Sequence, residues 1–122
     1  MGHDNARAVS GWHAHVYFDA ASRDAAWQLR QVIAERFAGD IESGALTLGR
    51  FHERPVGPHP LWSFQLGFGS ERLTAMLEWL ALNHGELGVF MHPNTGDDLR
   101  DHRDSAVWIG RSHKLVLTAF SR

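Results

Sequence analysis

The stretch that decides the fold is Trp12-His13-Ala14-His15-Val16-Tyr17-Phe18, in which apolar and polar side chains alternate. This period of two predicts a strand with one buried face. We expect the apolar side chains to face the core, namely Trp12, Ala14, Val16 and Phe18. We expect the polar side chains on the opposite, open face of the sheet, namely His13, His15 and Tyr17.

Further strands and two helices follow from the same kind of pattern. Residues 46–53, 62–68 and 87–92 are predicted strands, and apolar residues at helical spacing predict helices over 22–39 and 70–85. Each helix begins at a serine that suits an N-cap and ends at a glycine, Gly39 or Gly85. Residues 54–60 contain three prolines, which lack the N–H donor of a central strand, so we expect a stiff connection there.

The resulting order is β-α-β-β-α-β, followed by an extension with strands at 107–109 and 114–120. This order predicts an α+β, ferredoxin-like sandwich, with two helices on one face of an antiparallel sheet. In that topology the first and third strands are central, the fourth lies beside the first, and the second lies beside the third. We expect His13, His52, His59 and His92 to meet at one end of the sheet. The chain divides into a flexible tail, residues 1–10, and a single domain, residues 11–122.

Composition restricts the classes of function. The chain has 122 residues, 43% of them hydrophobic and 21% charged, which indicates one soluble globular domain. Its formal net charge of −2 argues against a nucleic-acid or membrane-surface partner. With no cysteine, disulfides, cysteine-based zinc sites and a thiol nucleophile are excluded. The first ten residues lack the apolar region of a signal peptide, and no segment is apolar enough to span a membrane, so we expect a cytoplasmic protein.

A polar loop after the strand at 87–92 carries most of the reactive groups. The stretch 92–102 begins and ends with histidine and contains three carboxylates and several turn-forming residues. On the strand before it, Phe90 and His92 are expected on the open face. Neighbouring strands lie about 4.8 Å apart, so a metal ion could be shared by His15 or His13 and His92. The alternative is that these histidines are ordinary polar residues of the sheet surface, because a chain with nine histidines often contains an H-x-H pair by chance.

Several histidine-bearing blocks also carry a resemblance to a known family. They are residues 12–18, the run from Gly49 to Pro60, the run from His92 to Asp97, and the pair Asp101-His102. Together these blocks resemble the DOPA 4,5-dioxygenase family over residues 11–117. The resemblance implies a ferredoxin-like, dimeric, extradiol-type dioxygenase that cleaves a catechol such as DOPA with O₂.

The resemblance also implies a metal and its ligands. Extradiol cleavage uses Fe(II) with open coordination positions, usually held by two histidines and a carboxylate; zinc or another divalent metal is an alternative in the isolated protein. We expect His15 and His92 as ligands, with His13 as a third ligand or as a neighbour of the metal. A carboxylate ligand stays open among four candidates, Glu53, Asp97, Asp98 and Asp101.

The remaining candidate residues would act on the substrate. His59 and His102 are candidates for moving the catechol protons, because a neutral histidine accepts and donates a proton near pH 7. Arg50 is a candidate for pairing with a substrate carboxylate. His52 and Tyr17 are further candidates for binding the substrate, although His52 and Arg50 could equally be the solvated end of an edge strand.

Two other functions fit the same sequence. One is a cofactor-free small-aromatic monooxygenase or isomerase, whose turnover would survive chelation. The other is a non-enzymatic metal- or ligand-binding module, whose metal site would be closed and tetrahedral. An open sheet face that carries Tyr17 and Phe90 also predicts a homodimer, with the partner covering that face.

Overall fold

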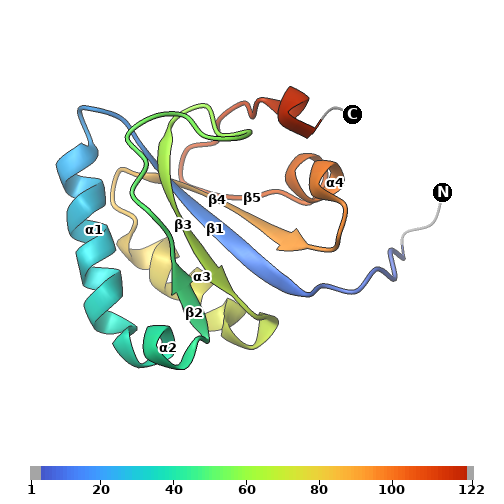
Figure 1. The fold of residues 1–122 in the computed structure, drawn as a ribbon, viewed down its shortest axis with the longest axis horizontal. Helices are drawn as coiled ribbons and strands as arrows, with labels where there is room; N and C mark the ends of the chain where they lie inside the picture. The colour runs from blue at the N-terminus through green and yellow to red at the C-terminus, as the bar shows by residue number, and fades with distance from the viewer. Residues whose placement is uncertain (1–3, 121–122) are drawn as a thin grey trace.

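The computed structural model describes residues 4–120 and contains a single five-stranded antiparallel sheet in the order β2-β3-β1-β4-β5 (Figure 1). The strands are β1 (Gly11–Phe18), β2 (Leu46–Leu48), β3 (Trp62–Phe68), β4 (Gly88–Asn94) and β5 (Val107–Ile109). The helices are α1 (Arg23–Arg36), α2 (Ala38–Ser43), α3 (Leu73–Asn83) and α4 (Asp98–Arg103), with 3-10 turns η1 (Ser70–Arg72) and η2 (Leu117–Phe120). The predicted ferredoxin-like α+β order is confirmed. Within residues 4–120, no helix has the length and apolar character needed to cross a membrane.

One face of the sheet packs against α1 and α3 and forms the apolar core. The predicted inward side chains of β1 are there, with Ala14 and Val16 fully buried and Phe18 nearly so. The helices contribute Ala26, Leu29, Ile33, Met76 and Leu80. The alternation of residues 12–18 therefore predicted the buried face correctly.

The opposite face is not open, which corrects the expectation that a partner subunit covers it. Tyr17 and Phe90 lie outside the apolar core, yet they are 2% and 0% exposed. The ring of Trp108 from β5 stacks on Phe90 at 4.7 Å, and the His59 ring from the proline-rich connection lies 5.4 Å from that of Tyr17. The chain itself covers these side chains, so they give no support to a homodimer, which stays a prediction.

Three predicted elements differ most from the structure. The strand expected over 46–53 ends at Leu48 and resumes only as an isolated bridge between His52 and Ser63. The first helix ends before Phe37, and Gly39 lies inside the separate helix α2, which the left-handed Gly44 ends (φ 85°). Residues 114–120 form no strand: the Val116 N–H donates to the Pro58 carbonyl oxygen of the proline-rich connection, and the segment ends in η2.

The expected meeting of His52 with His13 at one end of the sheet is also wrong. Both β1 and β2 run antiparallel to β3, so the end of β2 lies beside the end of β1. His52 is therefore level with Tyr17, because both pair with Ser63. His59 still reaches the histidines of β1, because the connection after residue 53 turns back over the sheet.

Candidate metal centre

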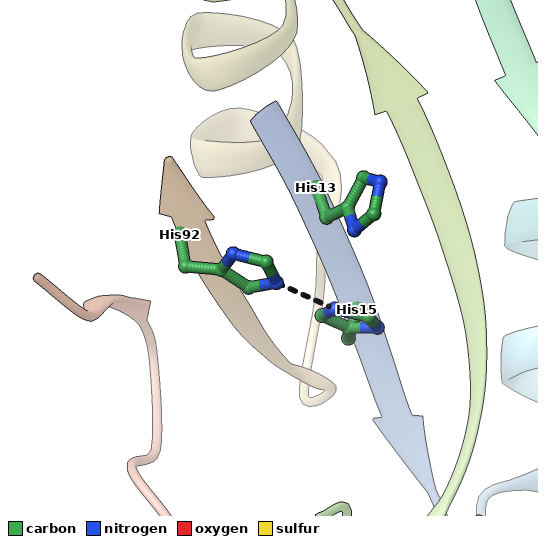
Figure 2. A group of neighbouring side chains, drawn as sticks. All are labelled: His13, His15 and His92. Atoms are coloured by element: carbon green, nitrogen blue, oxygen red, sulfur yellow. Dashed lines mark hydrogen bonds between the residues drawn. The ribbon is translucent and has the colours of Figure 1, made fainter. Parts of the chain in front are cut away.

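Three histidines from two neighbouring strands converge on the covered face of the sheet. His13 and His15 lie on β1, and His92 on β4 is the register partner of His13. One ligand nitrogen from each of the three lies within 4.8 Å of the others. Figure 2 shows the His15 and His92 rings facing each other, and their Nε2 atoms are 3.2 Å apart. The sheet register, set by β1 and β4, therefore places the predicted ligands together.

The separation of these nitrogens fits a shared metal ion. Two nitrogens about 2.1 Å from one ion lie about 3.0 Å apart at a right angle and about 3.4 Å apart at the tetrahedral angle. The observed 3.2 Å lies between these values. Among residues 4–120, the group contains three histidines and no carboxylate. Three imidazoles suit a borderline divalent ion such as Fe(II) or Zn²⁺ and leave coordination positions for other ligands.

The surroundings keep the histidines neutral, which ligation requires. Burial lowers the pKa of His92 to about 4. Burial, together with the neighbouring His59 and His92, holds the pKa of His15 well below its ordinary value. His92 Nδ1 donates to the carbonyl oxygen of Pro93 at 3.0 Å, and this bond leaves the Nε2 lone pair of His92 directed at His15.

Both predicted acid–base histidines lie against this cluster, one on each side. The His59 ring is 4.1 Å from that of His15, and the His102 ring from α4 is 3.9 Å from that of His92. Burial lowers the pKa of His59 to about 4, and its Nδ1 shares a 2.6 Å hydrogen bond with the Tyr17 hydroxyl. His102 Nδ1 donates to the carbonyl oxygen of Asp98 at 2.6 Å, so its Nε2 is left for other partners.

A pocket of about 200 Å³ opens beside His15. Its volume exceeds the roughly 150 Å³ of an apolar cavity that holds a benzene ring. Its lining comes from β1, β3 and the proline-rich connection, and consists of His15, His52, Val56, Gly57, Pro58, His59, Ser63 and Gln65. The predicted residues His52 and His59 thus share a pocket with a candidate metal ligand.

Other predicted site residues lie elsewhere. Arg50 is exposed and is not part of the pocket lining. Tyr17 is buried behind His59, so its hydroxyl contacts that ring and not the pocket. Both residues were predicted to bind substrate, and neither is among the side chains that line this pocket.

Three of the four carboxylates considered as ligands have other roles. Glu53 forms a 2.9 Å ion pair with Arg23. Asp97 caps α4 by accepting from the Arg100 N–H, and Asp98 is exposed. The buried Asp101 accepts hydrogen bonds from the Thr95 backbone N–H at 2.7 Å and hydroxyl at 2.5 Å, which fixes the loop after β4.

Sequence reasoning missed Ser63 and Gln65. The alternation of residues 62–68 was visible and puts these two polar side chains on the face of β1 that bears the histidines. The missing information was the register of β3 against β1, which sets Gln65 beside His15.

Comparisons with known proteins agree with these features. The family described as Dopa 4,5-dioxygenase family matches residues 12–119. A protein named DOPA 4,5-dioxygenase from Amanita muscaria is 37% identical over 112 residues, which are 89% of this chain and 49% of that protein. An uncharacterized 21.2 kDa protein from Botryotinia fuckeliana is 33% identical over 116 residues, which are 88% of this chain and 62% of that protein.

A solved structure gives the same result at the level of the fold. A chain from Nostoc punctiforme PCC 73102, provisionally named a dioxygenase, superimposes with a TM-score of 0.82 at 38% identity, over 91% of this chain and 90% of that one. The present chain spans about half the length of the Amanita protein and about three fifths of the Botryotinia protein. The resemblance seen in the histidine-bearing blocks is confirmed: this chain belongs to the Dopa 4,5-dioxygenase family.

Proposed function

We propose that this protein is a non-haem Fe(II) dioxygenase that opens the ring of a catechol, such as DOPA, in an extradiol manner. Membership of the Dopa 4,5-dioxygenase family supports an oxidoreductase. The observation that carries the proposal is the pair of facing Nε2 atoms of His15 and His92, 3.2 Å apart and beside a pocket that accommodates an aromatic ring.

His13, His15 and His92 would hold the metal. The sequence-based expectation of two histidines and a carboxylate becomes a set of three histidines, because the ligand atoms that converge within residues 4–120 belong to histidines alone. Bound iron would supply the activation of O₂ and catechol that organic side chains cannot. The protein's own part is to keep these imidazoles neutral and to exclude bulk water by covering the sheet face.

His59 is the proposed proton acceptor for the catechol. It lines the pocket, its ring lies against His15, and a neutral imidazole can take a proton from a bound hydroxyl. The Tyr17 hydroxyl both donates and accepts, so rotating it lets His59 Nε2 either accept a proton or release one. We therefore propose that Tyr17 orients His59, while its direct contact with the substrate stays a prediction.

His102 is the proposed second proton carrier, on the opposite side of the cluster. Its Nδ1 is fixed by the Asp98 carbonyl oxygen, which leaves Nε2 to exchange a proton with a group near His92. His52 is proposed to contact the substrate from the far wall of the pocket. A role for Arg50 would require a substrate that extends out of the pocket. Dimerisation and a cytoplasmic location stay predictions.

Anaerobic reconstitution tests the proposal. The full chain is loaded with Fe(II), mixed with DOPA and a panel of other catechols, and exposed to O₂ while oxygen uptake and ring-cleavage product are recorded. We expect one O₂ consumed per catechol cleaved, and loss of uptake in His15→Ala and His92→Ala. The matched control is His84→Ala, since His84 follows α3 and its Nδ1 donates to the Leu87 carbonyl oxygen. Undiminished turnover after chelation, or in His15→Ala, would contradict the proposal.

The three imidazole ligands also fit one alternative function. Three imidazoles are the ligands of known zinc centres, so the same cluster could hold Zn²⁺ in a non-enzymatic ligand-binding module. This alternative predicts tight zinc binding with no oxygen uptake for any catechol when Fe(II) is supplied.

A further inference from the structure

Asp101 is the only buried acidic side chain in the part of the chain that the structure describes. It lies on α4 at 2% exposure, and its two oxygens accept from the Thr95 backbone N–H at 2.7 Å and from the Thr95 hydroxyl at 2.5 Å. The second distance is typical of a hydroxyl that donates to an ionised carboxylate. Asp101 therefore places a negative charge inside the protein.

No cation of the described chain pairs with this charge. Within residues 4–120, Asp101 forms no ion pair with a lysine, arginine or histidine. Three arginines share a surface pocket with it, but they pair with Asp97 or Asp104 and their side chains reach solvent. A buried charge without a partner costs far more free energy than a buried neutral polar group, so a counter-charge is expected near Asp101.

The position of Asp101 links it to the histidine cluster. Thr95, which holds the carboxylate, lies three residues after His92 on the chain. Asp101 itself directly precedes His102, whose ring lies 3.9 Å from the ring of His92. Burial is the main influence on the pKa of His92 and lowers it, whereas the charge of Asp101 acts in the opposite direction and raises it. The carboxylate is therefore close enough to act on this end of the cluster.

The candidate ligands themselves carry no charge. The group that could hold a metal ion consists of His13, His15 and His92, and ligation requires each imidazole to be neutral. A carboxylate ligand would offset one charge of a divalent ion, whereas three imidazoles offset none. A metal ion at the cluster would thus lack a negative ligand, and Asp101 lacks a cation.

We propose that Asp101 compensates the charge of a divalent metal ion held by the three histidines, from outside the coordination sphere. Its carboxylate stays bonded to Thr95 and acts on the ion through space. This inference rests on the proposed function, because it takes the metal to be bound by the histidines of β1 and β4. It gives Asp101, a sequence-predicted candidate ligand, a role that involves no bond to the metal.

Zinc affinity tests this role without turnover. The full chain is titrated with Zn²⁺ in competition with a chelator at about pH 7.5, where aspartate is ionised. Asp101→Asn keeps the size of the side chain and an oxygen that can accept from Thr95, but it removes the charge. We expect the zinc dissociation constant to rise about tenfold, the lower end of the usual effect of losing an outer-shell partner.

Two further variants separate charge from local packing. Thr95→Val removes one hydrogen bond to Asp101 and keeps the charge, so the zinc dissociation constant should rise less than about threefold. The control is Asp104→Asn, which removes an exposed carboxylate from the same end of α4. Solvent screens that charge, so the constant should change less than about twofold.

The charge of the ion gives a readout that a purely structural role would not change. Coulomb energy is proportional to the charge of the ion, so the loss of binding free energy should be half as large for Cu⁺ as for Zn²⁺. Asp101→Asn should then weaken Cu⁺ binding about threefold, against about tenfold for Zn²⁺. Imidazole binds both metals, and Cu⁺ is measured anaerobically with a reductant present. A distorted site would weaken the binding of both ions by the same factor.

A crystal structure of the zinc-loaded unmodified chain tests the inference even if a variant misfolds. We expect zinc bound by the three histidines and Asp101 still bonded to Thr95. An Asp101 oxygen about 2.0–2.2 Å from zinc would make the residue a ligand and overturn the inference.

The outcomes separate this inference from the proposed function. The role of Asp101 alone would be overturned by an unchanged zinc affinity in Asp101→Asn, by equal losses for Zn²⁺ and Cu⁺, or by an equal loss in Thr95→Val. Zinc affinity that is unchanged in His92→Ala would overturn the metal site and the proposed function, and this inference with them.

Discussion

The two faces of the sheet are both buried, but they are buried by different means. Under α1 and α3, apolar side chains such as Val16 and Phe64 pack at 0% exposure in a continuous core. On the other face, the His59 ring of the proline-rich connection and the His102 ring of α4 lie against His15 and His92, which are 4% and 1% exposed. Burial of apolar groups stabilises the fold, whereas burial of ionisable groups costs free energy and keeps them neutral. The first face therefore accounts for stability and the second for chemistry.

The largest expected effect comes from breaking the apolar face. Phe64→Ala removes a fully buried ring and should lower the free energy of unfolding by about 3–5 kcal/mol, because the cavity is only partly refilled. Urea denaturation measures the change. Leu82→Ala, at a side chain that is 85% exposed, is the control and should change the free energy by less than about 0.5 kcal/mol. A decrease of less than about 1 kcal/mol in the free energy of unfolding of Phe64→Ala would contradict the claim that the apolar face provides the stability.

Removing a metal ligand from the histidine face should strongly weaken metal binding and change the free energy of unfolding only a little. His92→Ala should weaken metal binding more than about 100-fold, since even loss of an outer-shell partner costs 10- to 100-fold. The free energy of unfolding without metal should change by less than about 2 kcal/mol, because a costly buried polar group is removed together with its contacts. Competition with a chelator gives the affinity, and His84→Ala is the control. Unchanged metal affinity in His92→Ala would be evidence against this cluster as the metal site.

The pH dependence of stability should come from the histidine face. Burial lowers the pKa of His59 and His92 to about 4, whereas in the unfolded chain each is near 6.5. Between these values the unfolded chain binds more protons, so stability is full above pH 6.5 and falls as the pH falls toward 4. The slope is about 1.4 kcal/mol per pH unit for each such histidine.

Urea denaturation of metal-free protein between pH 8 and 4.5 measures this slope. The glutamine of His59→Gln does not titrate in this range. This variant should therefore lose the contribution of one histidine to the slope, about 1.4 kcal/mol per pH unit. A free energy of unfolding that stays constant from pH 8 to 4.5 would contradict neutral burial of these imidazoles.

The smallest effect concerns the bond that joins Tyr17 to His59. Tyr17→Phe keeps the buried ring and removes one 2.6 Å hydrogen bond, so it should lower the free energy of unfolding by about 1 kcal/mol. It should also reduce kcat with little change in KM, because His59 loses the contact that orients it. A change in KM alone would indicate that Tyr17 contacts the substrate directly.

Much of the fold could be predicted because its signals are local. The alternation of residues 12–18 predicted which side chains of β1 share a face. Ser70, predicted to cap the second helix, instead begins the turn η1 before α3, and Gly85 lies two residues past the last residue of α3. Gly39 was wrongly predicted to end the first helix, because α1 already ends before Phe37 and Gly39 lies in the short helix α2. The alternation of residues 114–120 misled because this segment bonds to the proline-rich connection through Val116 and Pro58, a long-range contact that no local pattern reveals.

The site was predictable where the sheet builds it and not where loops do. His13, His15 and His92 follow from strand order and side-chain direction alone. The Tyr17–His59 bond depends on how a connection with three prolines folds back over the sheet, a long-range contact that sequence spacing does not encode. Glu53 was a plausible ligand by composition, and only the structure shows that it pairs with Arg23.

The central claim is that one metal ion is held by the histidines of β1 and β4 beside the pocket. X-ray absorption of the Fe(II)-loaded protein under anaerobic conditions, with His15→Ala and His92→Ala in parallel, tests it most directly. The account predicts one iron per chain, a first shell with imidazole nitrogens near 2.1 Å, and loss of that signal in both variants. Iron bound with an unchanged first shell in either variant would contradict the account.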